Sequence, residues 1–152
     1  MKICFVSFEY PPLISGGAGI YASYLTRELA RLKNKIHVIS PASRRDAENI
    51  IEEGVFVHRI PLLNMPFIRA PSYWFSLRKC YEILNRSVVF DVLHTNALSD
   101  LSLPKRMVKI PRIVTVHHLA RSTLKIVDAS AFERLKDLRG ELGLAPIIER
   151  AL

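Results

Sequence analysis

Two adjacent glycines near the amino terminus are the residues best suited to bind a phosphate group. Gly16 and Gly17 separate a short apolar run, residues 2–7, from a segment whose apolar residues recur at helical spacing. Glycine can adopt φ > 0 and lets a ligand approach the backbone N–H groups. The first turn of a helix adds unpaired N–H donors and the positive end of the helix dipole. The pattern therefore predicts an anion site, although a strand-to-helix turn without any ligand would give the same pattern.

Polar residues at the ends of two predicted strands are expected to lie beside these glycines. His94 and Asn96 mark the end of the fourth predicted strand, and His117 and His118 mark the end of the fifth. Ligands of open parallel sheets bind beyond the carboxyl ends of the strands. We expect the fifth strand to deliver His117 directly to this edge, whereas His118 points the other way. For His94 the alternative is a structural histidine that is hydrogen-bonded at the edge of the sheet.

The segments that must position these residues alternate between strands and helices. Short, almost continuously apolar runs predict strands at residues 2–7, 35–40, 55–60, 89–94 and 112–117. Helical spacing predicts helices at residues 20–32, 74–88, 101–109, 128–139 and from 146 onward. Residues 43–53 are polar and are expected to form a surface connection, and Ser72 is the expected cap of the second helix.

This alternation predicts an α/β fold over residues 1–152, taken as one domain. Nearly continuous apolar strands are typical of a mostly parallel sheet that is covered on both faces. Right-handed crossovers then give a Rossmann-like, doubly wound layer with strand order 3-2-1-4-5. The last predicted helix begins at Pro146 and no strand follows it. We therefore expect the final strand of the sheet to be missing from this sequence.

Charge and cysteine content limit the partners and the location of the protein. The 152 residues carry 22 Lys and Arg against 14 Asp and Glu, a net charge of +8, which favours nucleotide phosphates or an anionic membrane surface as partners. The basic residues are dispersed and form no recognised nucleic-acid module, so nucleic acid is not expected. Cys4 and Cys80 lie far apart and suggest neither a disulfide nor a metal. We expect a cytoplasmic location, because no signal peptide is visible.

A dinucleotide site is the first alternative for the loop that leads into Gly16 and Gly17, called the glycine loop below. Gly17, Gly19 and Ala22 match the pattern G-x-G-x-x-A. That pattern belongs in a tight turn directly after a strand, whereas here a long loop intervenes. The acidic residue expected at the tip of the second strand is replaced by Ser40 and Pro41. The match is therefore weak.

Several segments, taken in order, resemble one enzyme family. They are residues 2–7, Tyr10-Pro11-Pro12, Gly16-Gly17, 35–41, 90–94 and 111–117. Together they are similar to the start of a family 4 glycosyltransferase, a large group of retaining enzymes that use nucleotide sugars. The resemblance covers essentially the whole chain and implies the amino-terminal, acceptor-side half of a GT-B fold. The donor-binding carboxyl-terminal domain would be absent, so we expect the 152 residues alone to be inactive.

The same resemblance implies roles for individual residues. Gly16 and Gly17 would contact the diphosphate of a donor such as a UDP- or GDP-sugar through their backbone N–H groups. His117 would act beside the transferred sugar as the catalytic residue, with no protein nucleophile and no metal. The residues expected to line the substrate rim are Ser15, His94, Asn96 and His118.

Some features leave the acceptor open. Glycogen synthases have a lysine just before the glycine pair, where this chain has Ile14 and Ser15, so that subfamily is disfavoured. The acceptor is expected to be a saccharide or a lipid-linked molecule. The apolar segment 62–74 is flanked by arginines and lysines, a mixture suited to a lipid-linked acceptor or to peripheral contact with an anionic membrane at its inner face. The alternative is that its aromatic residues pack in the core. A non-catalytic, phosphate-binding Rossmann module is the alternative function.

Overall fold

A computed structural model of the chain describes residues 1–117, apart from 15, 44, 64, 66, 98 and 101. Residues 1–116 form one compact unit, to which His117 does not belong. The helices predicted at residues 128–139 and from 146 onward lie outside the described residues, as do Ser15 and His118. The extent of the domain over all 152 residues stays a prediction.

The described strands form one mostly parallel sheet, which confirms the predicted fold class. Its strands stand in the order β3-β4-β2-β1-β5-β6. All neighbouring pairs are parallel except β3 with β4. Without β3 this is the predicted order 3-2-1-4-5. The strands are β1 (Lys2–Val6), β2 (Lys35–Ala42), β3 (Asn49–Glu52), β4 (Val55–Pro61), β5 (Val92–Asn96) and β6 (Arg112–Thr115).

Strand β3 corrects the expectation that residues 43–53 only form a surface connection. It pairs antiparallel with β4 at one edge of the sheet. The two strands are joined by Glu53 and Gly54, which have φ values of 48° and 82°. Two residues with positive φ make the turn that suits the twist of a β-hairpin. Ile50 packs against the core while Ile51 is 68% exposed. A shift of one residue would exchange these two side chains, so burial of Ile50 holds the edge strand in register.

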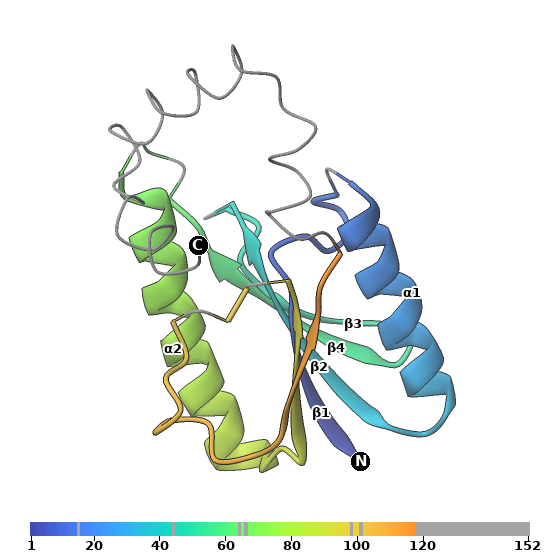
Figure 1. The fold of residues 1–152 in the computed structure, drawn as a ribbon. Coiled ribbons are helices and arrows are strands. Elements are labelled where there is room, and N and C mark those ends of the chain that lie inside the picture. Colours follow the sequence, from blue (N-terminus) through green and yellow to red (C-terminus); the bar gives the residue numbers. More distant parts are fainter. Residues whose placement is uncertain are drawn as a thin grey trace, which may run out of the picture. The chain divides into compact units, whose positions relative to one another are not determined.

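Two helices cover opposite faces of the sheet (Figure 1). They are α1 (Gly17–Arg31) and α2 (Arg69–Val88). Alternate residues of a strand point to opposite faces, and Cys4 and Val6 accordingly join the core beneath α2 while Phe5 joins the core beneath α1. Among the described residues, no helix combines the length and the hydrophobicity that crossing a bilayer requires.

The start of α2 differs from the prediction. The helix begins at Arg69, with Ile68 as N-cap, rather than near Trp74. Ser72 therefore lies within the first turn and is not the cap: its hydroxyl donates to the Arg69 carbonyl and accepts from the Leu63 N–H. Pro71 is compatible with this position because the first turn of a helix does not use its N–H groups.

The segment between β5 and β6 forms turns where a helix was predicted. The described part of residues 101–109 contains isolated turns, including an N–H of Met107 that donates to the carbonyl of Pro104 at 2.9 Å. Leu103 and Val108 are buried against the α2 side of the sheet. Their apolar spacing therefore reflects packing of an irregular segment. Val89 also differs from prediction: it ends α2 with φ of 54°, so β5 begins only at Val92.

Two stacked histidines connect the neighbouring strands β2 and β4. His37 Nδ1 lies 2.9 Å from His58 Nε2, and His58 Nδ1 lies 2.7 Å from Asn49 Oδ1. Because the amide oxygen accepts, His58 Nδ1 donates, and His37 Nδ1 in turn donates to His58. His37 Nε2 is then the unprotonated atom, buried and without a hydrogen-bond partner among the described residues. Burial, together with the nearby His58 and Lys35, lowers the pKa of His37 to about 4.

We expect this histidine to make the fold sensitive to mild acid. The unfolded chain binds the proton with a pKa near 6.5, so stability is present above that pH and is lost as the pH falls toward the folded pKa of about 4. Between pH 7 and pH 4.5, preferential protonation of His37 in the unfolded chain should lower the free energy of unfolding by on the order of 2 kcal/mol. Urea unfolding at both pH values should show a smaller loss for His37→Phe than for the native chain. Equal losses in the two proteins would contradict the assignment.

Candidate functional site

The loop between β1 and α1 folds back on itself before the helix begins. Tyr10 and Leu13 form an isolated β-bridge, and the Tyr10 N–H donates to the Leu13 carbonyl at 3.0 Å. The peptide bond between Pro11 and Pro12 is cis. The helix α1 starts at Gly17, with Gly16 as its N-cap. The structure therefore places the glycine pair at the amino terminus of a helix, as the spacing predicts.

The glycines of this loop have different roles. Gly16 has φ of −163°, an extended conformation open to any residue. A Cβ atom built on Gly17 would meet nothing within 4 Å. At Gly19, by contrast, a Cβ would lie 3.1 Å from Glu9 Cβ and 3.2 Å from Ile14 Cγ1. Gly19 thus serves the packing of the helix against the loop. The absence of a side chain at Gly17 leaves open space beside the first turn, and neither packing nor a positive φ explains it.

Glu9 lies at this site and was missed by the sequence interpretation. The Gly16 N–H donates to Glu9 Oε2 at 3.1 Å. The amide predicted to face a phosphate thus faces an anionic oxygen that belongs to the chain itself. A carboxylate and a phosphate make similar demands on a backbone N–H at a helix start. The signal that could have identified Glu9 is a lone acidic residue at the beginning of a loop whose predicted ligand is an anion.

Asn96 is buried and organises the loop from below. Its Nδ2 donates to Ser7 Oγ at 2.8 Å and to the Ala18 carbonyl at 3.0 Å. Ser7 Oγ donates in turn to the Glu9 carbonyl at 2.6 Å. Since the side chain is only 3% exposed, Asn96 holds the end of β1 and the first turn of α1 together. Within the described structure these contacts make it a positioning residue for the glycine loop.

His94 lies on β5, which is the strand between β1 and the edge strand β6. Its Nε2 lies 2.8 Å from Thr115 Oγ1, and its ring is tilted against the Phe5 ring with centroids 4.8 Å apart. Burial lowers the pKa of His94, because desolvation disfavours the charged imidazolium. Thr115 Oγ1 also lies 3.1 Å from the Tyr21 hydroxyl. This chain of contacts connects β5, β6 and α1 and agrees with the structural alternative for His94.

His117 follows β6 directly in the sequence and its side chain is exposed. It stands outside the compact unit formed by residues 1–116. Its catalytic role stays a prediction, and so do the roles of Ser15 and His118, which lie outside the described residues. Among the described residues, no group of three or more His, Cys, Asp and Glu side chains could hold a metal ion.

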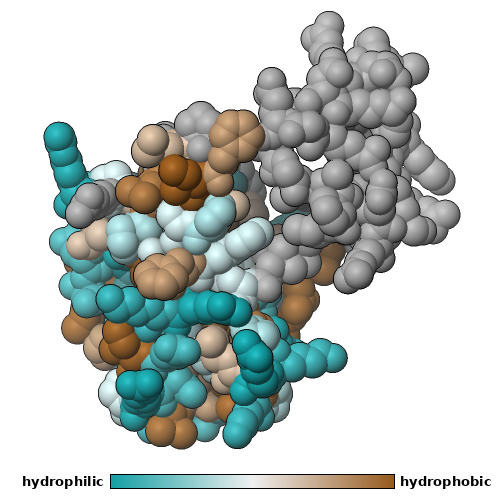
Figure 2. Space-filling model, turned by 90° about the vertical axis from the view of Figure 1, so that its left-hand side faces the viewer, coloured by the Kyte–Doolittle hydropathy of each residue, from teal (hydrophilic) through white to brown (hydrophobic). Residues whose placement is uncertain are grey.

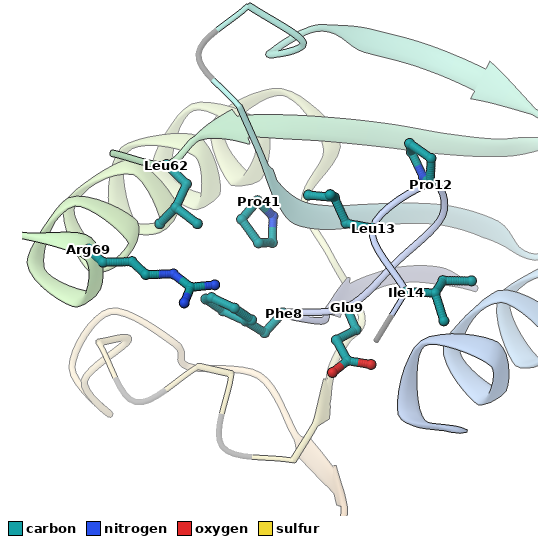
Figure 3. Close-up of a pocket in the computed structure, with 8 residues that line it drawn as sticks. All are labelled: Phe8, Glu9, Pro12, Leu13, Ile14, Pro41, Leu62 and Arg69. Atoms are coloured by element: carbon teal, nitrogen blue, oxygen red, sulfur yellow. The ribbon is translucent and has the colours of Figure 1, made fainter. Parts of the chain in front are cut away.

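A pocket of about 290 Å³ opens beside the glycine loop (Figure 3). It lies at the carboxyl ends of β1, β2 and β4 and reaches the first residue of α2. Its lining residues are apolar except for one acidic and one basic residue. The lining residues are Phe8, Glu9, Pro12, Leu13, Ile14, Pro41, Leu62 and Arg69. This position, beyond the ends of parallel strands, is where ligands of such sheets bind.

The described strands and helices form a Rossmann-like domain with a pocket beyond the carboxyl ends of its parallel strands. The structure is similar to sucrose-phosphate synthase from Thermosynechococcus elongatus, with a TM-score of 0.69 and 15% sequence identity. The similarity covers 86% of this chain and 36% of that protein, so the chain spans little more than a third of its relative. Comparison with curated proteins finds no match.

The sequence itself defines the family. Residues 15–142 match the model of Glycosyltransferase Family 4. The chain belongs to glycosyltransferase family 4, and the resemblance seen in its motifs is confirmed. The match includes the glycine pair, the polar ends of β5 and β6 and the pocket residue Arg69.

The two glycines Gly17 and Gly19 make a matched pair for testing the open space. Gly17→Ala should leave the free energy of unfolding unchanged or raise it slightly, because the new Cβ meets nothing within 4 Å and alanine favours the helix. Gly19→Ala should lower it by about 1–3 kcal/mol, because its Cβ would crowd Glu9 and Ile14. Urea unfolding measures both values. A larger loss at Gly17 than at Gly19 would refute this account of the loop.

Proposed function

We propose that this chain supplies the acceptor-side domain of a retaining glycosyltransferase. The enzyme would take a sugar from a UDP- or GDP-sugar and transfer it to a saccharide or a lipid-linked acceptor, in the cytoplasm and without a metal. Membership of family 4 and the Rossmann-like fold support sugar transfer. The donor nucleotide would be held chiefly by a second domain, so the 152 residues alone should not catalyse transfer.

The observation that carries this proposal is the open space at Gly17, at the first residue of α1. Departure of a nucleoside diphosphate leaves negative charge on the leaving oxygen. Fixed N–H donors and a helix amino terminus stabilise such a charge without reorganising during the reaction. The transferred sugar would pass through an oxocarbenium-like transition state, with His117 beside it. Glu9 would have to release the Gly16 amide, or share it, when the diphosphate binds.

The test uses the protein that joins this domain to its donor-binding domain. In that enzyme Gly17→Val should reduce kcat/KM by about 100-fold, comparable to losing one donor of an oxyanion site, because the branched side chain fills the phosphate space. His117→Ala should lower kcat more than it raises the KM for the donor. Transfer assays with a panel of nucleotide sugars measure both effects. Circular dichroism shows whether each variant is folded, and a folded Gly17→Val enzyme with native activity would overturn the proposal.

We also propose peripheral contact with an anionic membrane, at a cluster of exposed apolar residues before α2. Met65, Phe67 and Ile68 are 56%, 71% and 43% exposed. Figure 2 shows hydrophobic side chains gathered at the end of this face where α2 begins. Tyr73, by contrast, is 2% exposed and belongs to the core, so only part of the segment first considered is available to a membrane. Apolar side chains beside cations suit an interfacial site.

Phe67 and Phe75 offer a matched test of this contact, because each is 71% exposed and only Phe67 lies in the apolar cluster. Phe67→Ser should reduce binding to vesicles that contain anionic lipid by at least about threefold, while Phe75→Ser should leave it unchanged. The reason is the loss of one inserted aromatic side chain. Liposome co-sedimentation at low salt measures the bound fraction. Failure of the native chain to bind such vesicles would remove this part of the proposal.

A further inference from the structure

The residues that line the pocket beside the glycine loop include one acidic residue, Glu9, and one basic residue, Arg69. In Figure 3, Arg69 and Glu9 lie on either side of Phe8. The remaining lining is apolar and includes Leu13 and Leu62. A pocket of about 290 Å³ with this lining accommodates a small amphipathic molecule. The arrangement therefore points to a ligand that has an anionic group, an apolar portion and a hydrogen-bond donor.

Arg69 is positioned to bind the anionic group. It is the first residue of α2, and its guanidinium lies 5.4 Å from the centroid of the Phe8 ring. A guanidinium above an aromatic ring is attracted by the electrons of the ring face, which helps to hold it in place. Among the described residues, no carboxylate forms an ion pair with it. A planar guanidinium in this setting suits the two oxygens of a phosphate ester.

Glu9 connects the pocket to the glycine loop. Glu9 is one of the residues that line the pocket, and its carboxylate accepts the Gly16 N–H at 3.1 Å. A ligand in the pocket therefore lies next to the proposed place of the donor diphosphate. A carboxylate accepts hydrogen bonds only, so the ligand group that faces Glu9 must be a donor such as a hydroxyl. This is the arrangement that sugar transfer requires of an acceptor.

We propose that this pocket binds the acceptor, and that the acceptor is a phosphate ester with an apolar portion. Arg69 binds the phosphate, the apolar portion lies against Leu13 and Leu62, and a hydroxyl faces Glu9. This inference rests on the proposed function, which it narrows to one class of acceptor. Charge selects the class, because the guanidinium of Arg69 complements an anion while the apolar lining disfavours a purely polar one.

The test titrates the isotopically labelled 152-residue chain by NMR with four probes. Octyl phosphate has both an alkyl chain and an anionic phosphate. Octyl glucoside has only the alkyl chain, inorganic phosphate has only the anion, and glucose 6-phosphate is a phosphate ester without an apolar portion. Octyl phosphate, below its micelle concentration, should bind at least about tenfold more tightly than each of the others, a difference of about 1.4 kcal/mol. The amide signals of Phe8, Leu13 and Arg69 should shift. Equal binding of any other probe would overturn the proposal.

A pair of arginines on one helix supplies the control. Arg69→Gln should weaken the binding of octyl phosphate to the level of octyl glucoside, because only the alkyl chain is then recognised. Arg86→Gln makes the same change in charge at the far end of α2, where the side chain is exposed, and should leave binding unchanged. Leu13→Ser, at a side chain 49% exposed, should weaken octyl phosphate and not inorganic phosphate. Native-like affinity in Arg69→Gln would refute the assignment.

The two proposals fail separately. Loss of transfer in the Gly17→Val enzyme together with no preference for octyl phosphate would remove the acceptor assignment and leave the transferase standing. Binding of octyl phosphate at Arg69 together with full transfer activity in Gly17→Val would remove the proposed donor site. The pocket would then be shown to bind a phosphate ester, and its assignment as an acceptor site would fall.

Discussion

The side-chain amide of Asn96 holds together the three segments on which the site depends. From the end of β5 it donates to Ser7, at the end of β1, and to the carbonyl of Ala18, in the first turn of α1. A buried amide with satisfied hydrogen bonds specifies one arrangement of its partners, because any other leaves polar groups unpaired away from water. The direction in which the glycine loop presents its N–H groups follows from this contact.

The loop is also shaped by the negative charge that it carries within itself. The bond from the Gly16 N–H to Glu9 orders the helix start. Glu9 is also one of the residues that line the neighbouring pocket. One residue thus lies at both the proposed donor site and the proposed acceptor site. A carboxylate near a bound diphosphate is unfavourable, so occupation of one site would alter the electrostatics of the other.

The apolar segment before and within the first turns of α2 is divided between the core and the solvent. Tyr73 is buried and its hydroxyl donates to the Ser99 carbonyl at 3.0 Å. Arg59, which lies near in sequence, is paired with Glu48 and Glu52 at 3.3 and 3.4 Å. Phe67 remains exposed. Composition alone does not distinguish the buried residues of this segment from the exposed ones. The same apolar residue types occur both in protein cores and on protein surfaces.

The sequence by itself determined the elements with strong periodicity: the parallel strands and their order, the position of the glycine pair at a helix start, and the family to which the chain belongs. Local patterns suffice there, because burial on both faces requires continuous apolar strands and crossover handedness restricts the topology. The tertiary structure alone decided that Glu9 accepts the Gly16 N–H, that Asn96 is buried as a support, that His94 bonds Thr115, and that Arg69 and Glu9 border one pocket. These contacts join residues far apart in the chain, and their geometry depends on how the ends of separate strands meet, which no local pattern encodes.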